Sequence, residues 1–132
     1  MSVALKYVPV TVDDVDAGIR FYRDGLGFDS VRDIASNGFR WVQLGAPDGG
    51  PTLVLSEPSA GRSDADADAL ATLLLKGSLP FLVFEADDLD AAFERARAAG
   101  GSVLQEPQDQ PWGPRDCALR DPAGNPVRIA QR

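Results

Sequence analysis

The sequence of 132 residues contains no histidine and only one cysteine. Without histidine the chain cannot build a Ser-His or Cys-His nucleophile, and it lacks the commonest metal-ligating side chain. The lone Cys117 cannot form an internal disulfide, so the chain makes no demand for an oxidising compartment. We therefore expect a cytoplasmic protein.

Long apolar runs and an excess of positive charge are also missing. No apolar stretch approaches the roughly 18 residues of a membrane span, and no signal-peptide core follows Lys6. The chain has 13 Lys and Arg residues against 20 Asp and Glu, a formal net charge of −7. This balance disfavours nucleic acid and anionic membranes as partners, because both bind concentrated basic residues.

The sequence does contain an internal repeat. The stretch Val12-Asp13-Asp14-Val15-Asp16-Ala17 recurs 74 positions later as Ala86-Asp87-Asp88-Leu89-Asp90-Ala91. The turn Ala46-Pro47-Asp48-Gly49 recurs 75 positions later as Asp121-Pro122-Ala123-Gly124, again between runs that alternate apolar and polar residues. Two copies of one supersecondary unit are therefore predicted.

Each copy reads as strand, helix and three strands. The alternation in 4–12 predicts a strand, Asp13 or Asp14 offers a helix N-cap, and Gly25 and Gly27 are stop signals. We expect a first module over 1–58, a linker and helix over 59–77, and a second module over 78–132. The other predicted strands are 28–35, 38–44 (after a Ser36-Asn37-Gly38 turn), 52–57, 79–86, 102–106, 114–120 and 126–131, with a further helix over 89–99.

These repeated units, together with residues 21–28 and 120–126, resemble the vicinal oxygen chelate superfamily. This group includes glyoxalase I, the extradiol dioxygenases and the bleomycin resistance proteins. Gln110-Pro111-Trp112-Gly113 followed by Arg115 is especially similar to the bleomycin resistance branch. The resemblance implies an α+β fold over 1–132, a single domain in which two tandem βαβββ modules form a curved eight-stranded mixed sheet around a cavity.

In metal-dependent members of that superfamily, the first and last strand of each module supply the metal ligands. The repeat register places these positions at Tyr7, Leu53, Phe81 and Arg128. None of them is a credible ligand for a divalent metal, and a guanidinium at Arg128 would repel a cation. We therefore expect neither a metal nor another cofactor.

Four other polar residues could face the cavity by strand alternation: Glu57, Glu85, Asp116 and Gln43. They could rebuild a metal site, but we favour the interpretation that they are polar residues of the wall or rim. Glu57 or Glu85 could act as a general base if buried beside apolar walls. Cys117 is expected on the helix-facing side, as a buried structural thiol.

The remaining cavity face is aromatic and polar. Phe39, Trp41 and Gln43 share one face by alternation, Asp116 takes the position of Trp41 in the second copy, and Trp112 precedes the strand that carries Asp116. Flat apolar surface with a few polar anchors suits recognition. The alternative is that Phe39 and Trp41 only fill a shrunken core.

Three functions remain open from the sequence. We favour a metal-independent, homodimeric protein that binds a small molecule such as an antibiotic or an aromatic metabolite, as antibiotic resistance proteins of this type do. The second is a glyoxalase-like lyase or a dioxygenase-like enzyme with a non-standard metal or general-base site. The third is a dimeric interaction module without a small ligand. The sequence does not decide whether a cavity forms within one chain or across a dimer.

Overall fold

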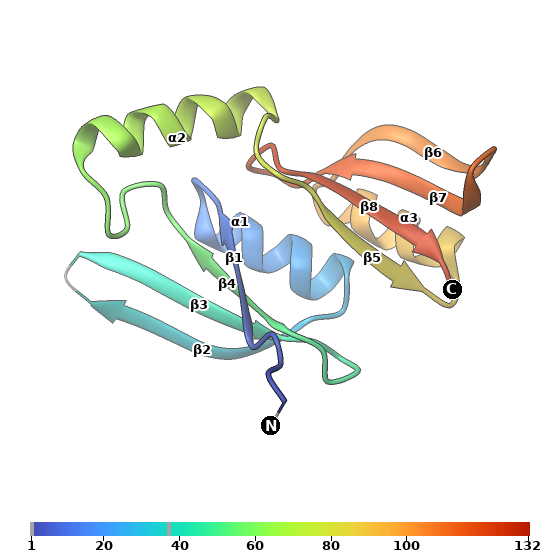
Figure 1. Cartoon of the computed structure of the whole chain (residues 1–132), viewed down its shortest axis with the longest axis horizontal. Helices are drawn as coiled ribbons and strands as arrows, with labels where there is room; N and C mark the ends of the chain where they lie inside the picture. The colour runs from blue at the N-terminus through green and yellow to red at the C-terminus, as the bar shows by residue number, and fades with distance from the viewer. Residues whose placement is uncertain (1, 37) are drawn as a thin grey trace.

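The computed structural model describes residues 2–36 and 38–132 and contains two βαβββ modules (Figure 1). The elements of module one are β1 (Tyr7–Thr11), α1 (Val15–Ile19), its π-helical continuation η1 (Arg20–Gly25), β2 (Asp29–Ser36), β3 (Phe39–Gly45) and β4 (Thr52–Ser56). Helix α2 (Asp64–Lys76) leads to module two, which comprises β5 (Leu82–Ala86), α3 (Leu89–Ala98), β6 (Ser102–Gln110), β7 (Gly113–Arg120) and β8 (Pro126–Gln131).

The eight strands form two sheets of four. Sheet one has the order β1-β4-β3-β2, and sheet two has the order β5-β8-β7-β6. In each sheet the first strand of the module pairs in parallel with the last, and the other pairings are antiparallel. The predicted α+β architecture of two βαβββ modules is confirmed.

Helix starts follow from local capping chemistry. The Asp14 carboxylate accepts a hydrogen bond of 3.1 Å from the Ala17 N–H, and Asp88 accepts one of the same length from Ala91. The repeated Asp-Asp sequence is therefore a repeated N-cap. Helix α2 is capped by Ser63 and ends at Gly77, whose φ of 72° is the left-handed conformation that glycine adopts readily.

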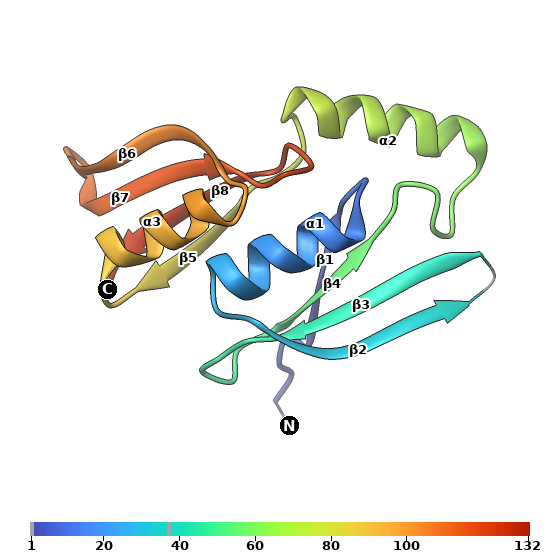
Figure 2. The same cartoon turned by 180° about the vertical axis from the view of Figure 1, so that it is seen from behind.

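Helices α1 and α3 lie on the same side of the molecule, where each covers its own sheet (Figure 2). Helix α3 also packs against η1, and Gly25 permits this contact because a side chain there would lie 3.1 Å from the Ala96 Cα. One continuous core results, with fully buried side chains from both modules, including Phe21, Tyr22, Leu44, Leu55, Leu89, Leu119 and Ile129. We call the opposite side of each sheet, seen in Figure 1, its open face.

Some boundaries differ from the prediction. Strand β1 begins at Tyr7, later than the predicted residue 4, and β6 continues to Gln110 through three register irregularities. Asn37 of the predicted turn lies outside the described residues. No helix in the described part of the chain is long and apolar enough to cross a membrane.

Candidate functional site

The open face of sheet one carries aromatic side chains. Phe39, Trp41 and Gln43 of β3 are partly exposed, whereas the alternating Val42 and Leu44 are completely buried under the helices. Tyr7 of β1 is 43% exposed, and the Lys6 Nζ lies 5.1 Å from the centroid of its ring. Trp41 and Phe39 therefore do not fill the core of this chain.

The open face of sheet two carries a polar network. The Arg128 Nη1 lies 2.9 Å from Asp116 Oδ2, and the Gln110 Nε2 donates a 2.7 Å hydrogen bond to Asp116 Oδ1. Asp116 and Gln110 are buried, while about a third of the Arg128 side chain (35%) remains exposed. Because β7 and β8 are the central strands of the sheet, this network presents one guanidinium at the middle of the open face.

The predicted place of Leu53 on the cavity face is wrong. Leu53 pairs with Leu44, is 3% exposed and belongs to the core on the helix-facing side. Leu119, the counterpart of Leu44, pairs with Val127, so Leu53 corresponds to Val127, and Val54 corresponds to Arg128. Eight residues separate Leu44 from Leu53 but only seven separate Leu119 from Val127, and a shift of one residue turns every side chain of a strand to the other face.

Two further predicted binding residues lie outside the strands. Phe81 comes directly before β5 and is 57% exposed, and Trp112 is 75% exposed in the turn between β6 and β7. Neither contributes to the buried part of an open face. Within this chain, the aromatic residues of sheet one and the Asp116 network of sheet two thus occupy separate sheets.

The two glutamates considered as a general base differ in their surroundings. Glu85 lies in β5 with a 62% exposed side chain, and its Oε2 is 3.3 Å from the Arg132 Nε. The burial required for a general base is therefore absent at Glu85. Glu57 follows β4 and is partly buried. No group of three or more Cys, Asp or Glu residues within the described ranges is arranged to hold a metal ion.

Cys117 lies in β7 on the helix-facing side and is fully buried. Burial is the main cause that raises the pKa of its thiol to about 11. The thiolate, which is the reactive form, is therefore disfavoured near neutral pH. The prediction of a buried structural thiol is confirmed.

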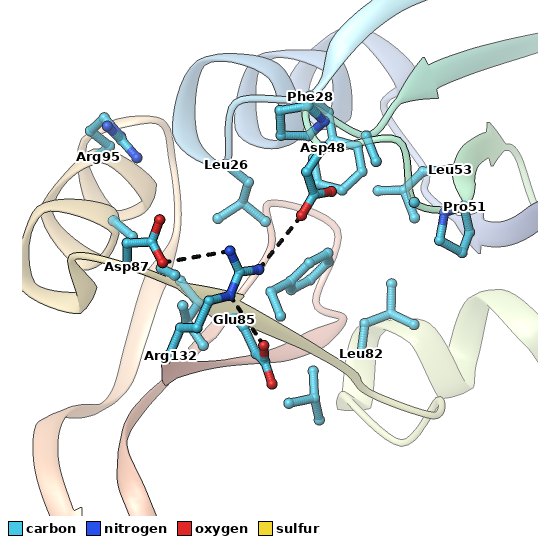
Figure 3. A pocket seen from close by; sticks show the side chains of 18 of the residues that line it. Leu26, Phe28, Asp48, Pro51, Leu53, Leu82, Glu85, Asp87, Arg95 and Arg132 are labelled. Carbon is cyan, nitrogen blue, oxygen red and sulfur yellow. Dashed lines mark hydrogen bonds and ion pairs between the residues drawn. The ribbon is translucent and has the colours of Figure 1, made fainter.

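Sequence reasoning missed a groove of about 700 Å³ between the two modules (Figure 3). Its apolar wall includes Leu26, Phe28 and Leu53 of module one and Leu82, Phe84 and Ile129 of module two. Phe28 and Phe84 meet edge to face with ring centroids 5.9 Å apart. No local pattern could have located this groove, because it depends on how the modules pack.

Arg132 lies at the charged rim of this groove. Its guanidinium is 3.3 Å from Glu85, 3.5 Å from Asp87 and 3.5 Å from Asp48, which belongs to the loop between β3 and β4 (Figure 3). Hydrogen bonding to Glu85 and the charge of Asp87 raise the pKa of Arg132. One cation is thus shared among carboxylates from both modules.

Comparison with known proteins agrees with this architecture. The family model of the Glyoxalase/Bleomycin resistance protein/Dioxygenase superfamily matches residues 4–129. The uncharacterized protein YurT of Bacillus subtilis (strain 168) is 28% identical over 125 residues, which cover 93% of this chain and 94% of YurT.

Solved structures of other proteins show the same fold over nearly the whole chain. The crystal structure of UcmS2 has a TM-score of 0.86 at 26% identity and covers 100% of both chains. TnmS3, an antibiotic binding protein from Streptomyces sp. CB03234, has a TM-score of 0.73 at 28% identity over 99% of this chain and 98% of its own. With its two βαβββ modules and a family match over nearly its whole length, this chain belongs to the glyoxalase/bleomycin resistance protein/dioxygenase superfamily.

Proposed function

We propose that this protein binds a small organic molecule, such as an antibiotic or an aromatic metabolite, without using a metal ion. The observation that carries the proposal is the pair of Arg128 and Asp116 on the open face of sheet two. The Arg128 guanidinium stands where the family resemblance places a metal ligand, and both Asp116 oxygens already accept hydrogen bonds. An organic ligand with a carboxylate, phenolate or carbonyl group suits this position better than a divalent cation does.

The open face of sheet one supplies a surface of the complementary kind. Tyr7, Phe39 and Trp41 offer aromatic area for a planar ligand, and each stacked contact contributes about 0.5–1.5 kcal/mol. The similarity to TnmS3, which is named as an antibiotic binding protein, supports a ligand of this class. A ligand with an aromatic body and an anionic or zwitterionic polar group would use both faces.

We further propose that the two faces come together in a homodimer. Within one chain they belong to separate sheets, and Tyr7, Phe81 and Val83 along this side are at least 43% exposed. A second copy related by twofold symmetry would place sheet one of each chain against sheet two of the other and cover these residues. Each dimer would then hold two equivalent cavities.

We also propose a cytoplasmic location, with which the single, buried thiol of Cys117 is compatible.

The test is a screen of aromatic natural products against the purified protein by intrinsic tryptophan fluorescence. Ligands found in the screen are then measured against Trp41→Ala and Arg128→Gln. We expect each substitution to weaken binding by at least about 0.5 kcal/mol, the lower end for one aromatic contact. Trp112→Ala extends the same test to the predicted binding residue in the β6–β7 turn.

Arg97→Gln is the matched control for Arg128→Gln. Arg97 is exposed on α3, on the helix side of the molecule, where it pairs with Glu94 at 2.7 Å. Its substitution should leave affinity unchanged. A tight ligand that is insensitive to both Trp41→Ala and Arg128→Gln in folded protein would place the site elsewhere and refute the proposal.

A further inference from the structure

The groove between the modules differs from the open faces in most of its wall, because Leu53 and Ile129 belong to the helix-facing side of their sheets. It borders the open face of sheet two at Val83 and Glu85 of β5, but Trp41, Asp116 and Arg128 do not line it. Its volume of about 700 Å³ falls within the roughly 300–1,000 Å³ of sites that hold drug-sized ligands. An apolar, partly aromatic wall of this size can bury the body of an organic molecule.

The charges around the groove are unbalanced. Four carboxylates and two guanidinium groups line it: Asp48, Glu85, Asp87 and Asp88, with Arg95 and Arg132. The excess of two negative charges favours a cationic group at the rim, because a cleft with low-dielectric walls strengthens the local potential. A basic residue already occupies this place, since Arg132 lies among three of the carboxylates.

The contacts of Arg132 are loose. Its nitrogens lie 3.3–3.5 Å from the carboxylate oxygens, whereas the Arg128–Asp116 pair is 2.9 Å long. About half of the Arg132 side chain (49%) is exposed, and exposed pairs of this kind hold each other weakly. A ligand ammonium group can therefore take over these carboxylates while the Arg132 side chain turns to solvent.

From these observations we propose that the groove between the modules is a second ligand site, for an amphipathic amine. The hydrocarbon or aromatic body would lie against Phe28, Phe84 and Ile129, and the protonated amine would pair with Asp48, Glu85 and Asp87 in place of Arg132. This inference does not depend on the proposed function, because it involves neither Trp41 nor Arg128. The Arg132 guanidinium thus competes with the ligand amine for these three carboxylates.

The experiment uses 4-phenylbutylamine as the probe and 4-phenylbutan-1-ol, which has the same body without the charge, as its control. Binding is followed by NMR through the methyl groups of Leu53 and Ile129 at low ionic strength. We expect saturable shifts of these methyl groups with the amine and roughly two- to fivefold weaker binding of the alcohol, in line with one exposed ion pair. Absence of saturable shifts, or equal affinity for amine and alcohol, would overturn the inference.

Substitutions test the competition directly. Arg132→Gln removes the competing cation and should tighten amine binding by about two- to fivefold. The double substitution Glu85→Gln with Asp87→Asn retains Arg132 and should weaken binding by a similar factor, which keeps the test valid if Arg132→Gln fails to fold. Weaker binding to a folded Arg132→Gln variant, or unchanged binding to the double variant, would contradict the proposal.

Two controls separate this site from its surroundings. Asp68→Asn changes the same charge on α2, away from the groove lining, and should leave amine affinity unchanged. Trp41→Ala and Arg128→Gln should also leave the shifts of Leu53 and Ile129 unchanged. If those open-face substitutions abolish the shifts, the amine is bound at the open faces and the groove is not its site.

Discussion

The Tyr22 hydroxyl donates a 2.7 Å hydrogen bond to the Asp121 Oδ2, joining two residues 99 positions apart. Both side chains are buried. The other Asp121 oxygen accepts hydrogen bonds of 2.9–3.0 Å from the N–H groups of Ala123, Gly124 and Asn125. Hydrogen bonds therefore connect the turn between β7 and β8 to η1 of module one. The Asn125 Nδ2 donates a further hydrogen bond to the Thr11 carbonyl oxygen.

We expect Tyr22→Phe to lower the free energy of unfolding by about 1–3 kcal/mol, because Asp121 loses a partner within the core. Tyr7→Phe is the matched control: Tyr7 is the other of the two tyrosines and is 43% exposed, so its effect should stay within about 0.5 kcal/mol. Urea denaturation at pH 7 measures both. Equal effects of the two substitutions would contradict a structural role for the Tyr22–Asp121 bond.

The same residue predicts a change at alkaline pH. Burial, followed by the charge of Asp121 and the hydrogen bond to it, raises the pKa of Tyr22 well above its usual value. The unfolded chain then releases this proton first, so its contribution to stability is complete below about pH 10 and is lost as the pH rises further. Tyr22→Phe should reduce the loss of stability above pH 10, which unfolding curves at pH 9 and pH 11 would show.

Gly25→Ala should destabilise the contact between η1 and α3. An added methyl group would lie 3.1 Å from the Ala96 Cα and 3.2 Å from the Ala99 Cβ, so the backbone of α3 would have to shift by a few tenths of an ångström. We expect a loss of about 1–3 kcal/mol in thermal or urea unfolding. At Gly113 an added Cβ would meet no described atom within 4 Å, so Gly113→Ala should cost less than about 0.5 kcal/mol. A neutral Gly25→Ala would mean that the helices pack less closely than described.

The Cys117 thiol should resist modification in the native protein. Its pKa of about 11 lies above the ordinary value near 9, so its contribution to stability is intact below about pH 9 and declines as the pH approaches 11. At pH 8 a disulfide reagent such as DTNB should react with less than one thiol per chain until denaturant is added, and then with one. Rapid reaction of the native protein would show that β7 opens readily.

The proposed homodimer should be detectable by light scattering at micromolar protein concentration. Val83→Asp places a charge on an exposed apolar position of β5 and should shift the population toward monomer without changing the fold. Thr72→Asp on α2, outside β5, serves as the matched charge control. A monomeric wild-type protein across the micromolar range would refute the assembly.

Metal independence is tested by elemental analysis of protein purified without chelators. We expect well below one zinc, iron, nickel or manganese per chain, because the family resemblance places a metal ligand at the position of Arg128 and the chain has no histidine. The variant Arg128→Glu provides a contrast, since it places a carboxylate where the wild-type protein has a guanidinium. About one equivalent of metal in the wild-type protein would disprove metal independence.

Local signals in the sequence predicted the elements well. Asp14 caps its helix as predicted, and the repeat places Asp88 at the same position of α3, because capping involves only neighbouring residues. The faces of β3 and β7 also followed from alternation. The place of Leu53 did not, since it depends on the length of a loop outside the strand.

Features that arise between the modules lay beyond sequence reasoning. The groove and the position of Arg132 among Asp48, Glu85 and Asp87 depend on packing of segments far apart in the chain. The same holds for the exposure of Glu85, which alternation alone does not reveal. Strand patterns define faces, but the partner of each face is set by the tertiary arrangement.

The loop between β3 and β4 is one residue longer than its counterpart between β7 and β8, with Gly49 and Gly50 in succession. After gene duplication, a single codon inserted at such a loop changes which set of side chains a strand presents to a ligand, without altering the strand itself. In this chain the longer loop aligns Val54 with Arg128, so that Leu53 joins the core and Val54 takes the place on the open face. The length of a loop outside a repeated strand can thereby decide which of its residues a ligand would meet.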